Sequence, residues 1–325
     1  MIELFIPIIA LLLSYLGSKY LASALAKRGL TVPDMHKPGT PQVPRPGGPA
    51  IAFAIVVALD ILYVVTGSEE VLALSLTVII AFAVGVYDDI RSLKGPVKVA
   101  LLFTASLPIL LLHTYVPLPP FPFAGHLRIT TIYPILVFLA IPVTSNAFNM
   151  IDIYNGLISG FSAIATLPLF VSFLIRGDML MVSISLIFMM TMLGFYLLHK
   201  NPSKLFPGDS GSLAIGAAYG AIAIIGRVEI VAVVALLPAI LNAFFVISSV
   251  GGIIEHKEMK KRPVRLNSDF TLVASRESDA PVTLARMLLS DGNLSEKEVV
   301  YRFFVLEAFA SLLAIITFLL TEVRL

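Results

Sequence analysis

Hydrophobic residues fall along the chain in blocks of about 20 positions, and short polar stretches separate these blocks. A helix rises about 1.5 Å per residue, so a block of about 20 residues covers the roughly 30 Å of hydrocarbon in a bilayer. The pattern predicts ten transmembrane helices, over residues 2–24, 48–66, 71–87, 97–116, 131–149, 157–175, 179–198, 212–226, 228–252 and 301–321. We therefore expect an all-α polytopic membrane protein that forms a single integral membrane domain, residues 1–325.

Composition supports this interpretation and excludes other classes. Hydrophobic residues make up 58% of the chain and charged residues 14%, against roughly 45–50% and about 25% in soluble domains. The net charge of +2, without a long basic run, argues against nucleic acid as a partner. The chain has no cysteine, which excludes disulfides and thiolate metal sites.

The basic residues orient the predicted helices. Ten spans put both termini on one side of the membrane and five loops on the other: 25–47, 88–96, 150–156, 199–211 and 253–300. With Lys98 included, the loop side carries 17 lysines and arginines, and the opposite side carries four. Cytoplasmic loops are enriched in these residues. We expect the five loops to face the cytoplasm, at the plasma membrane of a prokaryote or the endoplasmic reticulum of a eukaryote.

Two adjacent carboxylates end the third predicted helix. Asp88 and Asp89 follow Gly85 at the expected membrane boundary. Neighbouring carboxylates repel each other and are costly to bury, so a cation or a proton must compensate them unless the helix end is simply solvated. Lys98 follows two or three helical turns later and is expected to reach the same boundary.

A polar stripe marks the connection between the fifth and sixth predicted helices. Asn146, Asn149 and Asp152 recur every three residues, which places them on one face of a helix. Hydrogen bonds between helices are one way to satisfy the two amides. The added carboxylate favours a ligand or a metal ion.

Asp209 lies in a glycine-rich turn, between Gly208 and Gly211, before an apolar segment. A helix N-terminus offers free N–H groups to an anion, so Asp209 is either an ordinary N-cap or a metal ligand with phosphate oxygens nearby. Oxygen ligands without cysteine or a closely spaced histidine pair suit Mg²⁺ better than Zn²⁺. With basic residues on the same side, the pattern favours a diphosphate substrate.

The last loop, 253–300, is the only sizeable polar stretch, and it holds His256, Arg262 and Arg265. Contact with anionic lipid headgroups is one explanation of its charge. Recognition of an anionic substrate is the other.

At this point the chain resembles the polyprenyl-phosphate N-acetylhexosamine-1-phosphate transferase superfamily. Three blocks carry the resemblance: 85–89, 146–149 with 155–157, and 206–213. Within the superfamily the chain is most similar to the dolichyl-phosphate N-acetylglucosaminephosphotransferase branch of eukaryotes and archaea, in residues 105–108 and 155–160. Bacterial branches usually carry a histidine-rich motif in the last loop. The single His256 here argues against a muramyl-pentapeptide substrate, whereas Asp152 looks like the bacterial form of its loop.

The resemblance implies that GlcNAc-1-phosphate is transferred from UDP-GlcNAc to a polyprenyl (dolichyl-type) phosphate in the membrane lipid, with release of UMP. This would be the first step of lipid-linked glycan assembly. It also implies Mg²⁺, or alternatively Mn²⁺, at Asp209 and Asn149, and uracil recognition near Phe206, Gly156 and Asn155. The predicted catalytic residues are Asp88, Asp89 and Lys98, and the predicted substrate-binding residues are Lys37, Asn146, Asp152, Asn155, Gly156, Phe206, His256, Arg262 and Arg265.

Other interpretations stay open from the sequence. The same chemistry on another UDP-N-acetylhexosamine fits the motifs equally well, and the chain is either a monomer or a homodimer. A secondary transporter would also have about ten helices, but transporter sites lie near the bilayer midplane. The acidic residues here lie at predicted helix ends, with Asp60 as the one exception.

Overall fold

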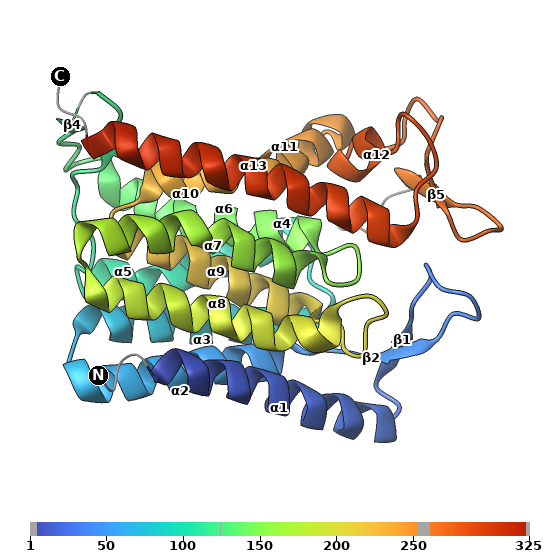
Figure 1. Cartoon of the computed structure of the whole chain (residues 1–325), viewed down its shortest axis with the longest axis horizontal. Helices are drawn as coiled ribbons and strands as arrows, with labels where there is room; N and C mark the ends of the chain where they lie inside the picture. The colour runs from blue at the N-terminus through green and yellow to red at the C-terminus, as the bar shows by residue number, and fades with distance from the viewer. Residues whose placement is uncertain (1–4, 124, 253–260, 323–325) are drawn as a thin grey trace.

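A computed structural model of the chain describes residues 5–123, 125–252 and 261–322. Helices dominate it and run side by side along the long axis of the molecule (Figure 1). Eight of them are long and apolar enough to cross a membrane: α1 (Ile6–Lys27), α2 (Gly48–Thr66), α3 (Glu69–Arg91), α6 (Tyr133–Ile151), α7 (Leu157–Arg176), α8 (Met179–His199), α9 (Gly208–Ile225) and α13 (Glu296–Glu322). The predicted all-α membrane architecture is confirmed.

The predicted count of ten spans is not confirmed. Helices α10 (Glu229–Ala235) and α11 (Leu237–Val250) meet at an angle of 67° and give a ninth span only if the bent pair is counted as one. The predicted span 97–116 is a shorter apolar segment, built from α4 (Gly95–Leu102), the 3₁₀ helix η2 (Phe103–Ser106) and α5 (Leu107–Leu111). Pro108 at the start of α5 removes one backbone donor, which explains part of this interruption.

Helix α9 lies at the centre of the bundle. It packs against α2, α3, α6, α7, α8 and α10, and 94% of its residues are buried. Small residues allow this close packing. A Cβ on Gly85 of α3 would lie 2.4 Å from the Cα of Ser210 on α9, so only glycine permits this approach. The close contact brings the end of α3 against the start of α9.

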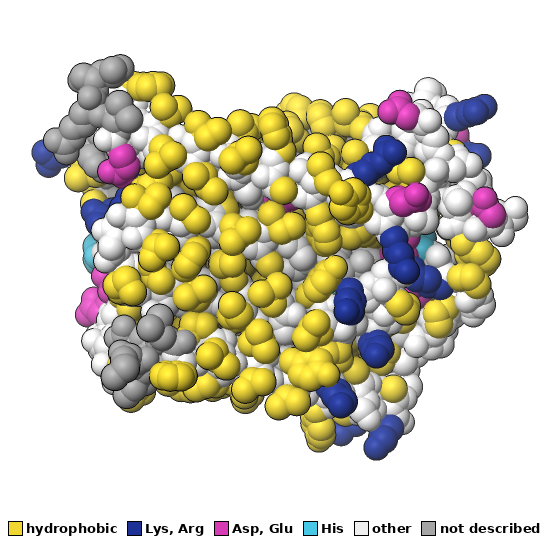
Figure 2. Space-filling view, viewed as in Figure 1, with side chains coloured by type: hydrophobic (Ala, Val, Ile, Leu, Met, Phe, Trp, Pro, Cys, Tyr) yellow, Lys and Arg dark blue, Asp and Glu magenta, His cyan; other side chains and the backbone are white. Residues whose placement is uncertain are grey.

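The surface divides into an apolar band and one polar end. Hydrophobic side chains cover most of the visible face, and lysine and arginine side chains gather at the right-hand end in Figure 2. The antiparallel hairpins β1 (Thr31–Pro33) with β2 (Gln42–Pro44), and β5 (Val264–Leu266) with β6 (Leu272–Ala274), lie at this end (Figure 1). The short pair β3 (Pro120–Phe121) and β4 (Gly125–His126) lies at the other end. The chain is therefore an integral membrane protein; that the polar end faces the cytoplasm stays a prediction.

Candidate active site

The predicted catalytic residues meet at the polar end, where α3 ends and α4 and α9 begin. The Nζ of Lys98 lies 2.5 Å from Oδ2 of Asp88 and 3.2 Å from Oδ1 of Asp209. Lys98 is almost fully buried, at 2% exposure. A buried ammonium needs a partner of opposite charge, and here two carboxylates from different helices supply it. The backbone N–H of Leu93 donates to the other oxygen of Asp88, at 2.7 Å.

A second cation, Arg45, completes what we call the ion-pair cluster: Arg45, Asp88, Asp89, Lys98 and Asp209. Its Nη2 lies 2.7 Å from Oδ2 of Asp209 and 3.2 Å from Oδ1 of Asp89. The sequence-based site did not include Arg45. One feature of the sequence could have indicated Arg45: it lies between two prolines, shortly before Gly47 and Gly48. These residues lead into α2, so the basic side chain is held near the beginning of a helix.

Asp89 anchors the N-terminus of α9. Its two carboxylate oxygens accept the backbone N–H groups of Asp209 and Ser210, each at 3.0 Å. These N–H groups have no partner within their own helix. The carboxylate of Asp209 lies in the first turn but does not serve as an N-cap: Asp89 takes that role from a neighbouring helix. Both oxygens of Asp209 therefore face the two cations.

The two predicted metal ligands lie on different helices, Asn149 on α6 and Asp209 on α9, and Ser212 connects them. The Oγ of Ser212 donates to Oδ1 of Asn149 at 2.7 Å, and Ser212 follows Asp209 by three residues on α9. Carboxylate and amide oxygens are the donors that a hard divalent cation prefers. The donor set fits Mg²⁺ or Mn²⁺.

Asp152, which directly follows α6, interacts electrostatically with the charges of the ion-pair cluster. Asp152 is half-buried, and burial raises its pKa to about 7. The charge of Arg45 opposes this rise, and the carboxylates of Asp209 and Asp89 add to it. Asn146 instead donates to the carbonyl of Pro142 within its own helix, at 2.8 Å. Its predicted role as a substrate contact gains no support from this geometry.

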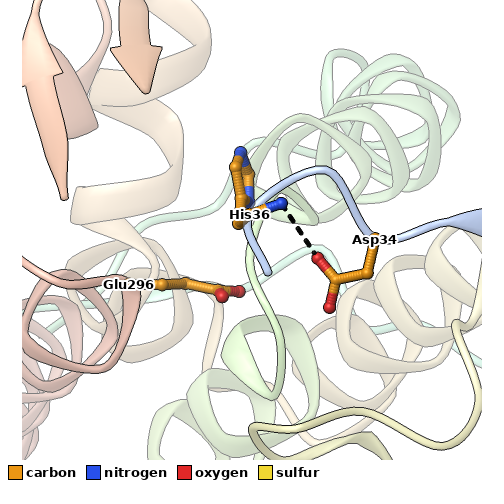
Figure 3. Close-up of side chains that lie close together, drawn as sticks. All are labelled: Asp34, His36 and Glu296. Carbon is orange, nitrogen blue, oxygen red and sulfur yellow. Dashed lines mark hydrogen bonds between the residues drawn. The ribbon is translucent and has the colours of Figure 1, made fainter. Parts of the chain in front are cut away.

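A second polar cluster lies among the loops. Asp34, His36 and Glu296 hold three potential ligand atoms within 4.8 Å of one another (Figure 3). Lys37, predicted to bind substrate, forms an ion pair with Glu296 and lies 3.9 Å from Asp34. Lys37 pairs with Glu296 and Asn155 donates to Asp34, so groups of the protein already satisfy both carboxylates, and we assign no metal ion to the cluster. Asn155 also joins it, through hydrogen bonds to Asp34 and Glu296.

The other predicted contacts lie around these two clusters. The backbone of Phe206 is held by two hydrogen bonds: its N–H donates to the carbonyl of Pro44, and its carbonyl accepts from the N–H of Gly47. Gly156, with φ +85°, lies directly before α7, in a conformation that favours glycine.

Two of the predicted basic residues of the last loop, Arg262 and Arg265, lie within the described part of the chain. Arg265 forms an ion pair with Glu277 within the loop itself, and Arg262 is exposed. His256 lies outside the described residues. The helix α12 (Leu284–Leu288) in this loop is linked to α11, because Oδ1 of Asn242 accepts from the N–H of Leu284 at 2.9 Å.

These features define an all-α integral membrane protein with a partly buried site of paired charges at one end of its helices. Comparison with known proteins refines the class. The glycosyl transferase family 4 profile matches residues 71–227. The chain is 30% identical to the phospho-N-acetylmuramoyl-pentapeptide-transferase of Shouchella clausii over 250 residues, 71% of this chain and 74% of that protein. The chain belongs to glycosyl transferase family 4, within the polyprenyl-phosphate hexosamine-1-phosphate transferase superfamily.

Two archaeal relatives resemble the chain over much of its length. A Saccharolobus solfataricus protein, provisionally named UDP-N-acetylglucosamine–dolichyl-phosphate N-acetylglucosaminephosphotransferase, is 25% identical over 332 residues, 97% of either chain. A Sulfolobus acidocaldarius protein with the same provisional name is 29% identical over 232 residues, 67% of this chain and 70% of that protein.

Proposed function

We propose that the chain transfers GlcNAc-1-phosphate from UDP-GlcNAc to a polyprenyl phosphate of the dolichyl type, releasing UMP and forming polyprenyl-diphosphate-GlcNAc. The observation that carries the proposal is the placement of Asp209 between Lys98 and Arg45, 3.2 and 2.7 Å from their nitrogens, at a helix N-terminus. Two cations at one point suit phosphate oxygens. The full-length similarity to the Saccharolobus protein supports the choice of substrates.

The reaction requires little covalent chemistry from the protein. An oxygen of the prenyl phosphate attacks the β-phosphorus of the nucleotide sugar, a new P–O bond forms, and the bond to the bridging oxygen breaks as UMP leaves with the electron pair. The second pKa of a phosphate monoester is about 6, so the nucleophile is largely ionised near pH 7 without a strong base. Phosphoryl transfer then depends mainly on positioning and on charge stabilisation.

Each residue of the ion-pair cluster has a role in that stabilisation. Lys98 and Arg45 stabilise negative charge that develops on the phosphates. Asp88 orients Lys98 and is the nearest candidate to accept a proton. Asp89 holds the N-terminus of α9 in place through its two backbone hydrogen bonds. We therefore assign Asp88 to the reaction and Asp89 to positioning.

Asp209 and Asn149 are the residues that would hold the divalent cation. Mg²⁺ or Mn²⁺ would neutralise charge on the diphosphate and favour departure of UMP. The apolar surface beside the polar end allows the prenyl tail to stay in the hydrocarbon while its phosphate reaches the site (Figure 2). We further propose that the last loop, 253–300, contacts the sugar, with His256, Arg262 and Arg265 as its basic residues.

A panel of UDP-sugars at fixed prenyl phosphate tests the proposal. Purified full-length protein should release UMP from UDP-GlcNAc, and the release should require both Mg²⁺ and the lipid acceptor. Faster release from another UDP-N-acetylhexosamine would support the proposed reaction but contradict GlcNAc as its sugar. No release from any UDP-sugar would contradict the proposed function.

A further inference from the structure

Helix α1 reaches farther at the polar end of the molecule than its neighbour α8. Both helices run toward that end (Figure 1). A Cβ on Gly194 of α8 would lie 3.0 Å from the Cβ of Ser14 on α1, and the Oγ of Ser14 donates to the carbonyl of Thr191 at 2.7 Å. Residue 14 is therefore level with residues 191–194. Because α8 ends at His199, α1 passes the end of α8 between residues 19 and 22.

A second neighbour, α2, ends at a similar level. A Cβ on Gly17 of α1 would lie 3.8 Å from the Cβ of Ala50 on α2. Helix α2 runs in the opposite direction and begins at Gly48, two residues before Ala50, so its polar end is level with residue 19 of α1. Helix α1 continues to Lys27. At 1.5 Å per residue, its last turns extend about 8–12 Å beyond the ends of both neighbours.

The extended part of α1 carries what we call the α1 cavity. It has a volume of about 260 Å³ and is lined by Tyr20, Ser23, Ala24, Lys27 and Arg28. Residues three, four and seven positions apart lie on one face of a helix. Lys27 and Arg28 are exposed, and lysine and arginine side chains gather around this end of α1 in Figure 2.

The positive charge of the α1 cavity is not balanced by the protein. Among the described residues, no carboxylate forms an ion pair with Lys27 or Arg28. Helix α1 itself contains no acidic residue between its first and last positions. The cavity is therefore complementary to an anion from outside the chain.

An apolar stripe on the same face of α1 leads to the cavity. It consists of Ile9, Leu12 and Leu16, which are 38%, 49% and 57% exposed, and Tyr20 follows one turn later at 79% exposure. Helix α1 is long and apolar enough to cross a membrane, so the stripe faces lipid acyl chains. Tyrosine is enriched where the hydrocarbon meets the headgroups. Tyr20 lies at the level where the neighbouring helices end, which is where this boundary is expected.

We propose that this face of α1 binds an anionic phospholipid of the bilayer. The acyl chains lie along the apolar stripe, and the phosphate occupies the α1 cavity beside Lys27 and Arg28. Helical side chains lean toward the N-terminus of their helix, so Lys27 reaches back from its extended position toward the headgroups. The hydroxyl group of Ser23 adds a hydrogen-bond donor. A zwitterionic lipid brings its own ammonium, which two cations disfavour, so the site selects a lipid with net negative charge.

The test compares phosphatidylglycerol with phosphatidylcholine, each added to the purified full-length protein in neutral detergent. Phosphatidylglycerol should raise the Tm of wild type at a lower mole fraction than phosphatidylcholine does. Each basic residue near an anionic lipid contributes about fivefold to binding. Lys27→Gln together with Arg28→Gln should therefore raise the mole fraction of phosphatidylglycerol needed for the half-maximal rise about tenfold or more.

A matched variant controls for the loss of two positive charges. Arg91→Gln together with Lys94→Gln removes the same charge at exposed positions on α3 and before α4, and should leave the lipid dependence unchanged. Native mass spectrometry gives a second readout that does not depend on Tm. Wild type and the control should retain phosphatidylglycerol, and the variant at Lys27 and Arg28 should lose it.

Three results would overturn the inference. The first is an equal response to phosphatidylglycerol in wild type and in the variant at Lys27 and Arg28. The second is equal stabilisation of wild type by the two lipids, since the headgroup charge would then have no effect. The third is a variant that loses binding of an added prenyl phosphate but keeps phosphatidylglycerol, which would assign the cavity to the acceptor. None of these measurements uses UMP release, so they are independent of the proposed function.

Discussion

Replacing Lys98 by methionine is the sharpest perturbation of the ion-pair cluster. The ammonium is buried between Asp88 and Asp209, and its loss leaves Asp88 without its cation. Removing one partner of a buried ion pair costs roughly 3–5 kcal/mol of stability. Removing one group that stabilises charge in the transition state costs roughly 10²–10³ in turnover. Lys98→Met should therefore lower both Tm and kcat.

A double variant separates these two effects. Asp88→Asn together with Lys98→Met removes the uncompensated carboxylate, so it should recover much of the lost Tm but none of the lost turnover. Lys94→Met is the matched control, because Lys94 is exposed four residues earlier on the chain. UMP release from UDP-GlcNAc measures turnover, and thermal unfolding in detergent measures stability.

Two results would refute this reasoning. Turnover of Lys98→Met within about threefold of wild type would show that Lys98 stabilises no charge in the reaction. Recovery of turnover in the double variant would show that Lys98 only neutralises Asp88.

Three other predictions follow from the structure. Burial raises the pKa of Asp152 to about 7, so the contribution of this carboxyl group to the free energy of unfolding falls as the pH rises from about 4 through 7. The Tm of wild type minus the Tm of Asp152→Asn, both measured in EDTA, should therefore fall between pH 5 and 8. A constant difference would contradict the raised pKa. Gly85→Ala puts a Cβ 2.4 Å from Ser210 and should cost about 1–3 kcal/mol by overpacking, measured as a lower Tm; Gly252→Ala, with open space around it, is the control, and equal Tm values would contradict the packing argument. Asp209→Asn should raise the Mg²⁺ concentration needed for half-maximal turnover about tenfold or more, and an unchanged Mg²⁺ titration would remove Asp209 as a ligand.

Much of the fold was predictable because a membrane helix is recognised from a local property of the sequence, the length of its apolar segment. Interruptions within an apolar block are less visible. The segment 97–116 and the block 228–252 each read as one span, yet the first divides into three short helices and the second bends by 67°. Packing against neighbouring helices decides such breaks, and a single-chain hydropathy pattern does not contain that information.

The acidic half of the candidate site was also predictable, since carboxylates at the ends of apolar helices are costly without a function or a partner. The partners were harder to predict. Arg45 and Glu296 belong to loop and helix-end segments, where charged residues are common. Only the three-dimensional structure shows that Arg45 pairs with Asp209, 164 positions later, and that Glu296 accepts from Asn155, 141 positions earlier. Lys37 was predicted to bind substrate, and in the structure its ammonium pairs with Glu296.

The most direct test of the central claim is the stoichiometry of the reaction in purified protein with Mg²⁺, UDP-GlcNAc and a prenyl phosphate. Mass spectrometry of the lipid and chromatography of the nucleotide should show one prenyl-diphosphate-GlcNAc formed for each UMP released, and neither product without the divalent cation. Formation of UDP in place of UMP, or of a lipid that gained the sugar without its phosphate, would contradict transfer of a sugar phosphate at this site.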